Sequence, residues 1–246
     1  MDRLETTALP LWRRLLWRCL SLAWLWLLAT VVGVAFRGTV NPSTTAFMQE
    51  KQQELAAEGV HGAYLQYQWV DYAHIAPSMR LAVVTAEDQS FPTHHGFDWD
   101  AIAAAMQHNA HSRHPRGAST LSQQTAKNLW LWPGHSYVRK FLEAYLTVLM
   151  EAEWPKRRIL ETYLNVAQFD DYTFGVGAAA RQLFGKTPAQ LSPEEAALLA
   201  AALPSPDRFD VADPSSYLKQ RQAWILEQMQ GLGTDYLDGM ERPLKR

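Results

Sequence analysis

The strongest constraint on this chain is an 18-residue run, Cys19 to Phe36, that contains no charged side chain. A helix of this length is just sufficient to cross the hydrocarbon core of a bilayer, and Arg18 can snorkel to lengthen it. The nearby arginines lie mainly before the run, so the positive-inside rule predicts a cytoplasmic N-terminus, residues 1–18, and an external remainder. A cleaved signal peptide is the alternative, but the run is long for one and Ala35 to Gly38 is a poor cleavage site. We therefore expect an uncleaved membrane anchor at residues 19–36.

The rest of the composition is that of an ordinary globular protein. A length of 246 residues suits one compact domain with a small appendage. The formal charge of −2 and the lack of a long basic run argue against nucleic acid as a partner. The single cysteine, Cys19, excludes an internal disulfide framework and a thiolate metal cluster. The tryptophans gather in patches, which suits either a membrane interface or a Trp-rich core.

Beyond the anchor, the pattern predicts a mainly α-helical fold. Residues 37–58 are expected to be a linker and a leading helix, residues 59–232 the main domain, and residues 233–246 a C-terminal tail. Strand signals are scarce, with one short strand or extended segment at Ala63 to Val70. Capping residues and apolar periodicity predict the further helices. These are the helix that leads into Glu87, Trp99 to about Asn109, Ser136 to Glu153, Lys156 to Asn165, Gly177 to Phe184, Ser192 to Pro204, and Asp213 to about Gln230.

The acidic pair Glu87-Asp88 opens the sequence EDQSFPTHHG, directly after a mostly apolar helical stretch. A carboxylate at the end of a helix that then breaks can point into a cleft while its backbone stays rigid. The ordinary alternative is a helix-terminal pair that faces solvent. The decapeptide alone does not decide between the two.

A second stretch, Arg116 to Asn128, is rich in hydroxyl, amide and amino groups. A site for a sugar or a phosphate needs many such donors with fixed geometry. The alternative is a helix N-terminus capped by Ser119 or Thr120, which is itself a good anion site. Both interpretations can hold together.

Other charged and histidine residues have structural interpretations at this stage. Arg139 and Glu143 are four residues apart, which is typical of an intrahelical ion pair. Glu161 lies beside the apolar face of its helix. Five histidines invite a metal site, but their spacing matches no zinc signature and a polar surface is the better interpretation. They are His94, His95, His108, His111 and His114.

Four motifs in order make the chain resemble the monofunctional biosynthetic peptidoglycan glycosyltransferases, whose module also occurs in bifunctional penicillin-binding proteins. The first, E-D-x-x-F-x-x-H-x-G, is met by Glu87, Asp88, Phe91, His94 and Gly96. The second, S-T-x-x-Q-Q-x-x-K-N, is met by Ser119, Thr120, Gln123, Gln124, Lys127 and Asn128. The third, R-K-x-x-E, is met by Arg139, Lys140 and Glu143. The fourth, K-x-x-I-L-E-x-Y-L-N, begins at Lys156 and includes Glu161.

The resemblance implies a lysozyme-like helical domain with a small membrane-proximal jaw lobe. It implies a processive reaction in which an acceptor hydroxyl attacks C1 of a lipid-linked donor sugar, with inversion and release of undecaprenyl pyrophosphate. Glu87 is then the general base. Glu143 is the second acidic catalytic residue, which either holds a divalent Mg²⁺ or Mn²⁺ ion with the pyrophosphate or positions Arg139 and the donor. No nucleotide or organic cofactor is implied. The substrate contacts implied are Asp88, Phe91, His94, Ser119, Thr120, Gln123, Gln124, Lys127, Asn128, Arg139, Lys140 and Glu161.

The expected partners are lipid II, the growing glycan chain, the bilayer, and other cell-wall synthesis and division proteins. The expected location is the inner membrane, with a single span and a periplasmic catalytic domain. Two alternatives remain. One is a lytic enzyme of lysozyme-like fold, which would need no phosphate site. The other is an inactive membrane-anchored scaffold, which would be free to lose Glu87 or Glu143.

Overall fold

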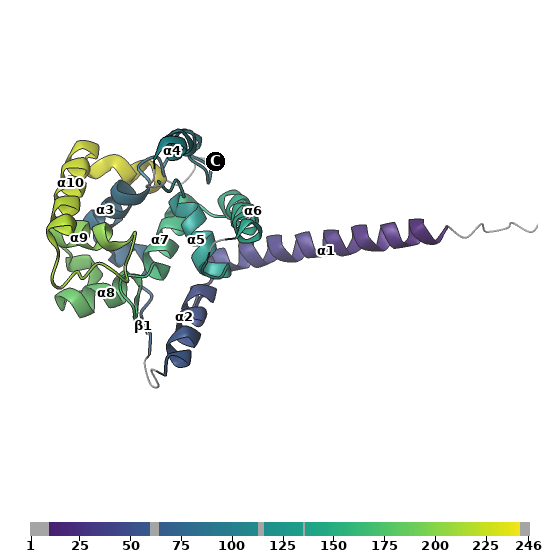
Figure 1. The fold of residues 1–246 in the computed structure, drawn as a ribbon, viewed down its shortest axis with the longest axis horizontal. Coiled ribbons are helices and arrows are strands. Elements are labelled where there is room, and N and C mark those ends of the chain that lie inside the picture. The colour runs from purple at the N-terminus through teal and green to yellow at the C-terminus, as the bar shows by residue number, and fades with distance from the viewer. Residues whose placement is uncertain (1–9, 60–63, 113–115, 135, 242–246) are drawn as a thin grey trace, which may run out of the picture.

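A computed structural model describes residues 10–59, 64–112, 116–134 and 136–241, and its described part is mainly α-helical, as predicted (Figure 1). The helices are α1 Leu11–Thr39, α2 Ala46–Ala57, α3 Pro77–Glu87, α4 Trp99–His111, α5 Leu121–Trp130, α6 Tyr137–Glu153, α7 Lys156–Val166, α8 Gly175–Phe184, α9 Pro193–Ala202, α10 Ser216–Leu232 and α11 Asp238–Glu241. Short 3₁₀ turns are η1 Tyr72–His74, η2 Pro188–Gln190 and η3 Thr234–Leu237. The strands β1 Gln66–Tyr67 and β2 Thr173–Phe174 pair in parallel.

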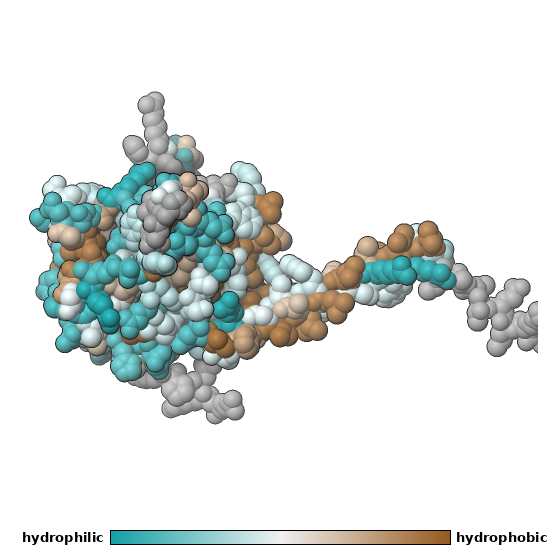
Figure 2. Space-filling model, turned by 90° about the horizontal axis from the view of Figure 1, so that it is seen from below, coloured by the Kyte–Doolittle hydropathy of each residue, from teal (hydrophilic) through white to brown (hydrophobic). Residues whose placement is uncertain are grey.

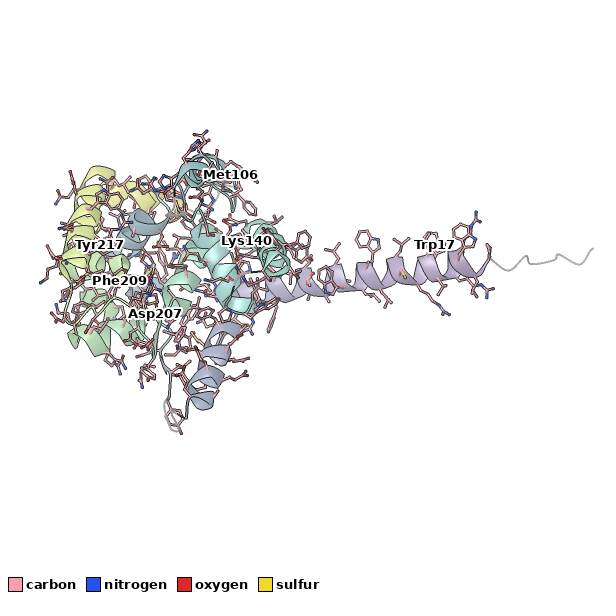
Figure 3. All side chains as sticks on the ribbon, in the orientation of Figure 1. Trp17, Met106, Lys140, Asp207, Phe209 and Tyr217 are labelled. Atoms are coloured by element: carbon pink, nitrogen blue, oxygen red, sulfur yellow. The ribbon has the colours of Figure 1, made fainter. Side chains whose placement is uncertain are left out.

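Helix α1 is longer at both ends than the expected span of residues 19–36, and it is long and apolar enough to cross a membrane. Its N-terminal part projects from the domain, and Trp17 lies on that part, clear of the other helices (Figures 1 and 3). Its C-terminal part is docked: Trp26 stacks on Tyr145 of α6, and the indole Nε1 of Trp154 donates to the carbonyl of Val34 at 2.9 Å. The anchor is therefore joined to the domain by specific contacts.

The core of the domain is built around α3, whose Met79, Ala82, Val83 and Val84 are fully buried. Helix α9 packs against both α3 and α10. Its row of alanines allows the helix backbones to approach closely, since Ala197, like its neighbours in the row, is fully buried. Burial on all sides fixes where α3 ends, and so fixes the position of Glu87.

The small β1–β2 pair is attached to the helices by Asn165 of α7. The Asn165 amide accepts from the Val70 backbone N–H at 2.7 Å and donates to the Val70 carbonyl at 2.8 Å. Gly175 follows β2 with φ +79°, and a Cβ there would lie 2.4 Å from the Asn165 carbonyl oxygen. Only glycine fits such a close approach at positive φ.

Two segments expected outside the main domain belong to it in the structure. Helix α2 is capped by Thr45 and packs on α5, with Met48 and Leu55 buried. Within the expected tail, 233–246, residues 234–241 are helical and Leu237 is buried. The Tyr236 hydroxyl donates to the Gln89 carbonyl at 2.5 Å, so this segment supports the loop that follows Glu87.

Candidate active site

Glu87 is the last residue of α3, and its carboxylate is partly buried at the edge of a cavity. Helix α3 ends there because the next residue, Asp88, leaves the helical conformation with φ −161°. The Glu87 Oε2 atom accepts a hydrogen bond from Gln124 Nε2 at 2.8 Å. The other end of that amide, Gln124 Oε1, accepts from the Tyr163 hydroxyl at 3.3 Å, which fixes how the amide is turned. Gln124 of the second motif and Tyr163 of the fourth thus hold the Glu87 carboxylate in one orientation.

Burial raises the pKa of Glu87 above its ordinary value, because a desolvated carboxylate is less stable in its charged form. The hydrogen bond from Gln124 and the positive charge of Arg221 act in the opposite direction. Arg221 comes from α10 and its Nη2 donates to the carbonyl of Ala86 at 3.1 Å. A carboxylate with a raised pKa is a stronger base than usual and is suited to accept a proton.

Glu87 lies between two hollows. The larger, the catalytic cavity, has a volume of about 540 Å³. Its lining includes Glu87, Gln124, Lys127, Asn128, Tyr163, Phe47, Lys51, Glu54 and the loop from Leu203 to Asp207. The second hollow, of about 440 Å³, shares Glu87, Gln124 and Pro204 and adds Ser119, Asp88 and Arg221. Two groups bound in these hollows would therefore meet at the same carboxylate.

Lys127 supplies a largely buried cation to the catalytic cavity. Burial lowers the pKa of its ammonium, while the nearby carboxylate of Glu143 acts to raise it. The ammonium lies 5.4 Å from the ring centre of Phe47, within cation–π range. A cation held mainly by an aromatic ring stays available to an anionic ligand.

Glu143, the second catalytic candidate, is almost fully buried and forms ion pairs with two cations. Its Oε2 accepts from Arg139 Nη1 at 2.8 Å, which confirms the intrahelical pair predicted from their spacing. Its Oε1 accepts from Lys140, whose ammonium also donates to the Ser119 hydroxyl at 3.0 Å. Because both of its oxygens are engaged, Glu143 is placed to hold the cations near Lys127.

Asp88 and His94 support the site through a buried hydrogen-bond network. Asp88 Oδ2 accepts from the Leu121 backbone N–H and from His94 Nε2, each at 2.9 Å. The Gly96 backbone N–H donates to His94 Nδ1, so the ring carries its proton on Nε2. This network fixes the start of α5 relative to the end of α3, and both residues are buried.

Several residues expected to touch substrate have structural partners in this structure. Phe91 is fully buried below the ammonium of Lys156, 4.5 Å from it. Thr120 and Gln123 form the capping box of α5, which confirms the predicted helix N-terminus. Glu161 accepts from the Tyr72 backbone N–H and from Arg158, away from the cavity lining described above. Phe91, Gln123 and Glu161 line neither hollow, whereas Thr120 also lines the second one.

The donor set does not fit a divalent ion well. The described residues contain no group of three His, Cys, Asp or Glu side chains that could hold a metal. A metal at Glu143 would have to displace Arg139 or Lys140 from a carboxylate oxygen. The five histidines that were considered as a metal site from the sequence include His114, which lies outside the described residues.

Sequence reasoning missed Arg221, Tyr163, Phe47 and Lys51 as members of the site. Tyr163 lies in the fourth motif, but its position on the apolar face of the helix indicates only a core residue. Arg221, Phe47 and Lys51 come from helices that no motif marks, and only the packing of α2 and α10 brings them to Glu87. No local pattern reveals that placement.

The fold and the site define a class: a mainly helical enzyme in which one partly buried carboxylate stands beside a group of cations. A family profile described as Transglycosylase matches residues 52–230. Named relatives include a "Biosynthetic peptidoglycan transglycosylase" of Xanthomonas campestris pv. campestris, 50% identical over 83% of both chains. Relatives with the same name come from Xanthomonas oryzae pv. oryzae, 49% identical over 93% of this chain and 94% of that one, and from Pasteurella multocida, 45% identical over 98% and 100%. The chain belongs to the transglycosylase family, whose lysozyme-like helical fold was predicted from its motifs.

Proposed function

We infer that this protein is a peptidoglycan glycosyltransferase that polymerises lipid II into linear glycan strands. The observation that carries the inference is that Glu87, oriented by Gln124, borders the same cavity as the buried cation Lys127. A base and an anion site at one cavity suit transfer of a sugar from a pyrophosphate leaving group to a hydroxyl. The names of the relatives and the family profile point to the same chemistry.

Glu87 acts as the general base in this mechanism. A sugar hydroxyl is a poor nucleophile at neutral pH, so its proton must be taken as it attacks C1 of the donor sugar. An acceptor in one hollow and a donor in the other would both reach Glu87, which lines both hollows. Attack from the side opposite the leaving group inverts the configuration at C1.

The cations stabilise the leaving pyrophosphate, which gains negative charge in the transition state. Lys127 lines the cavity, and Arg139 and Lys140 lie behind it on Glu143. Glu143 thereby keeps two positive charges close together that would otherwise repel each other and Lys127. No step is assigned to a metal ion, because the cations present already supply positive charge to the leaving group.

The alternatives are less well supported by this site. A lytic enzyme would need a carboxylate and water, but no cation buried beside the carboxylate. An inactive scaffold would not need Glu87 to be held by Gln124 and Tyr163 in a cavity.

Purified protein incubated with lipid II should produce polymer and release undecaprenyl pyrophosphate. Cleavage of preformed glycan strands without polymer formation would favour the lytic enzyme, and neither reaction would favour the scaffold.

We further propose that α1 spans the inner membrane and that α6 lies partly within the outer leaflet. The part of α1 before Trp26 rises about 22 Å at ~1.5 Å per residue, which is less than the ~30 Å of a hydrocarbon core. A full span must therefore include the residues that dock on α6. The exposed apolar residues of α6, Tyr137, Val138, Phe141 and Val148, then lie beside lipid. Figure 2 shows apolar surface along α1 and at the adjoining edge of the domain.

Leu129 and Leu131, in the apolar segment that ends α5, are buried in the domain and do not face the bilayer. Trp132 is 43% exposed, and Trp99 and Met106 of α4 are about 70% exposed, so these remain candidates for the interface. Contacts with other cell-wall synthesis and division proteins stay a proposal that follows from the same location.

A further inference from the structure

Helix α2 forms one wall of the catalytic cavity, although it lies outside all four motifs. Phe47, Lys51 and Glu54, which lie on one face of α2 at helical spacing, line the cavity together with Glu87 and Lys127. The opposite side of the helix is exposed at Gln49 and Glu50. Met48 and Leu55 are 3% exposed and pack α2 onto the domain, so α2 is a fixed wall of the cavity.

The ring of Phe47 faces the Lys127 ammonium, with 5.4 Å between the nitrogen and the ring centre. It also contacts Phe174 edge to face, at 6.2 Å between ring centres, which holds the ring in place. An ammonium over an aromatic face is attracted without losing its charge. An acidic partner at this position would instead compete with an anionic substrate.

Lys51 is a second cation on the cavity wall, and its side chain is 19% exposed. Its ammonium lies 3.1 Å from Glu54 Oε2, and Glu54 is 55% exposed, so the ion pair is partly open to solvent. Exposed i,i+3 ion pairs are worth little, and an incoming diphosphate can displace such a carboxylate at small cost. Lys51 and Lys127 therefore offer two positive charges from two different walls.

The wall is also tied to the membrane anchor. Only six residues separate the end of α1 from the start of α2. Arg158 donates to the Val40 carbonyl and to the Asn41 side chain, and the Tyr67 hydroxyl donates to the Pro42 carbonyl at 2.6 Å. The linker is thus pinned, and α2 is held at a fixed place relative to α1.

We propose that α2 completes the site for the diphosphate of the lipid-linked substrate, with Phe47 as the positioning residue for Lys127 and Lys51 as a second diphosphate-binding residue. This inference rests on the proposed function. It assigns substrate recognition to the segment that directly follows the anchor.

Phe47 is tested by comparing Phe47→Leu with Phe47→Trp, since both keep an apolar side chain but only tryptophan keeps an aromatic face. We expect kcat/KM for lipid II to fall about 5- to 30-fold in Phe47→Leu, the worth of a desolvated cation–π contact, and to stay within about threefold in Phe47→Trp. Equal activity of Phe47→Leu and wild type, or an equal loss in both variants, would overturn the positioning role. An equal loss would indicate packing alone.

Lys51 is tested with Lys51→Gln, Lys51→Arg and Glu54→Gln, with Lys219→Gln on the exposed side of α10 as the matched control. We expect Lys51→Gln to raise KM about 10- to 150-fold, which is the range of a hydrogen bond to a charged group, with little change in kcat. Lys51→Arg keeps the charge and should restore most of the wild-type KM, and Glu54→Gln removes the competing carboxylate and should not raise KM. Lys219→Gln should stay near wild type. Equal effects of Lys51→Gln and Glu54→Gln would show that only the helix pair matters and would contradict the proposal.

A binding measurement separates this inference from the proposed function. Full-length Glu87→Gln protein is titrated with farnesyl pyrophosphate in detergent, with and without Lys51→Gln and Phe47→Leu. Weaker binding in both double variants supports the proposed role of α2 in diphosphate binding, whether or not the protein turns over lipid II. Unchanged binding in both overturns it, whereas wild-type protein that makes no polymer refutes the proposed function instead.

Discussion

The surroundings of Glu87, the proposed general base, combine burial with groups that stabilise its charged form. Burial raises its pKa, while Gln124 and Arg221 stabilise the ionised form. A carboxyl group with a raised pKa is a stronger base than an ordinary carboxylate, which suits it to accept a proton as the hydroxyl attacks. The same balance makes its pKa sensitive to both neighbours.

The pH dependence of kcat/KM should report this balance. The base must be deprotonated, so activity should fall as pH drops through the raised pKa of Glu87, above the ordinary carboxylate range. Arg221→Gln removes a charge that lowers this pKa and should move the acid limb to higher pH, whereas Arg221→Lys should leave it near wild type. An acid limb that does not move in Arg221→Gln would show that another group controls the profile.

Thermal stability should show the cost of holding Glu87 in this place. Its folded-state pKa is raised, so the protein is destabilised once pH exceeds the ordinary value and the group must ionise in the folded state. Glu87→Gln should therefore melt at a higher temperature than wild type at pH 8. The difference should shrink as pH falls toward 4, and a variant that melts lower at pH 8 would contradict the assigned direction of the pKa shift.

At the scale of elements, the site depends on how helix ends and short segments meet. The motifs allowed the end of α3, the capped start of α5 and the Arg139–Glu143 pair to be predicted, because each depends on residues close in sequence. The placement of α2 and α10 at the cavity could not be predicted, because it depends on packing between distant segments. The buried Phe91 and the paired Glu161 show that a motif residue can serve the site by supporting it.

Asn165 is such a supporting residue, and its loss should affect stability. Its fully buried side chain bonds both backbone groups of Val70 and donates to the carbonyl of Glu161. Asn165→Ala leaves those groups without partners and should cost about 2–3 kcal/mol, or about 4–12 °C in Tm. Thermal denaturation checks this, with the exposed Gln220→Ala as a control that should stay within about 1 °C. A loss below about 1 kcal/mol would show that the hydrogen bonds of the Asn165 side chain are not needed for stability.

At the scale of the whole molecule, the anchor and the domain act as one unit. Trp26, Thr30 and Val34 of α1 contact α6 and Trp154. A Cβ at Gly38 would lie 2.6 Å from Trp154 Nε1, so the junction admits little variation. With α1 in the membrane as proposed, these contacts would hold the cavity at a set distance from the bilayer.

Residual membrane binding should survive removal of residues 1–36. The exposed apolar face of α6 should still bind liposomes, and Phe141→Asp should weaken that binding about tenfold or more, since Phe141 is 73% exposed. Co-sedimentation with liposomes measures this, and Tyr217→Asp on the exposed surface of α10 is the control. Complete loss of binding on truncation would place α6 outside the membrane.

The orientation of the anchor follows from Arg13, Arg14 and Arg18 before the apolar run. A reporter that is active only outside the cytoplasm, fused after Arg246, should be active. A signal from a reporter active only inside the cytoplasm would reverse the proposed topology.

The division of labour between the two carboxylates is tested most directly by polymerisation of lipid II by Glu87→Gln and Glu143→Gln. Glu87→Gln should lower the rate by roughly 10²- to 10⁴-fold, or about 3–5 kcal/mol of barrier, while lipid II binding changes little. Glu143→Gln releases the paired cations and should weaken binding and turnover together. A Glu87→Gln enzyme that polymerises at nearly the wild-type rate while Glu143→Gln does not would contradict the assignment of Glu87 as the general base.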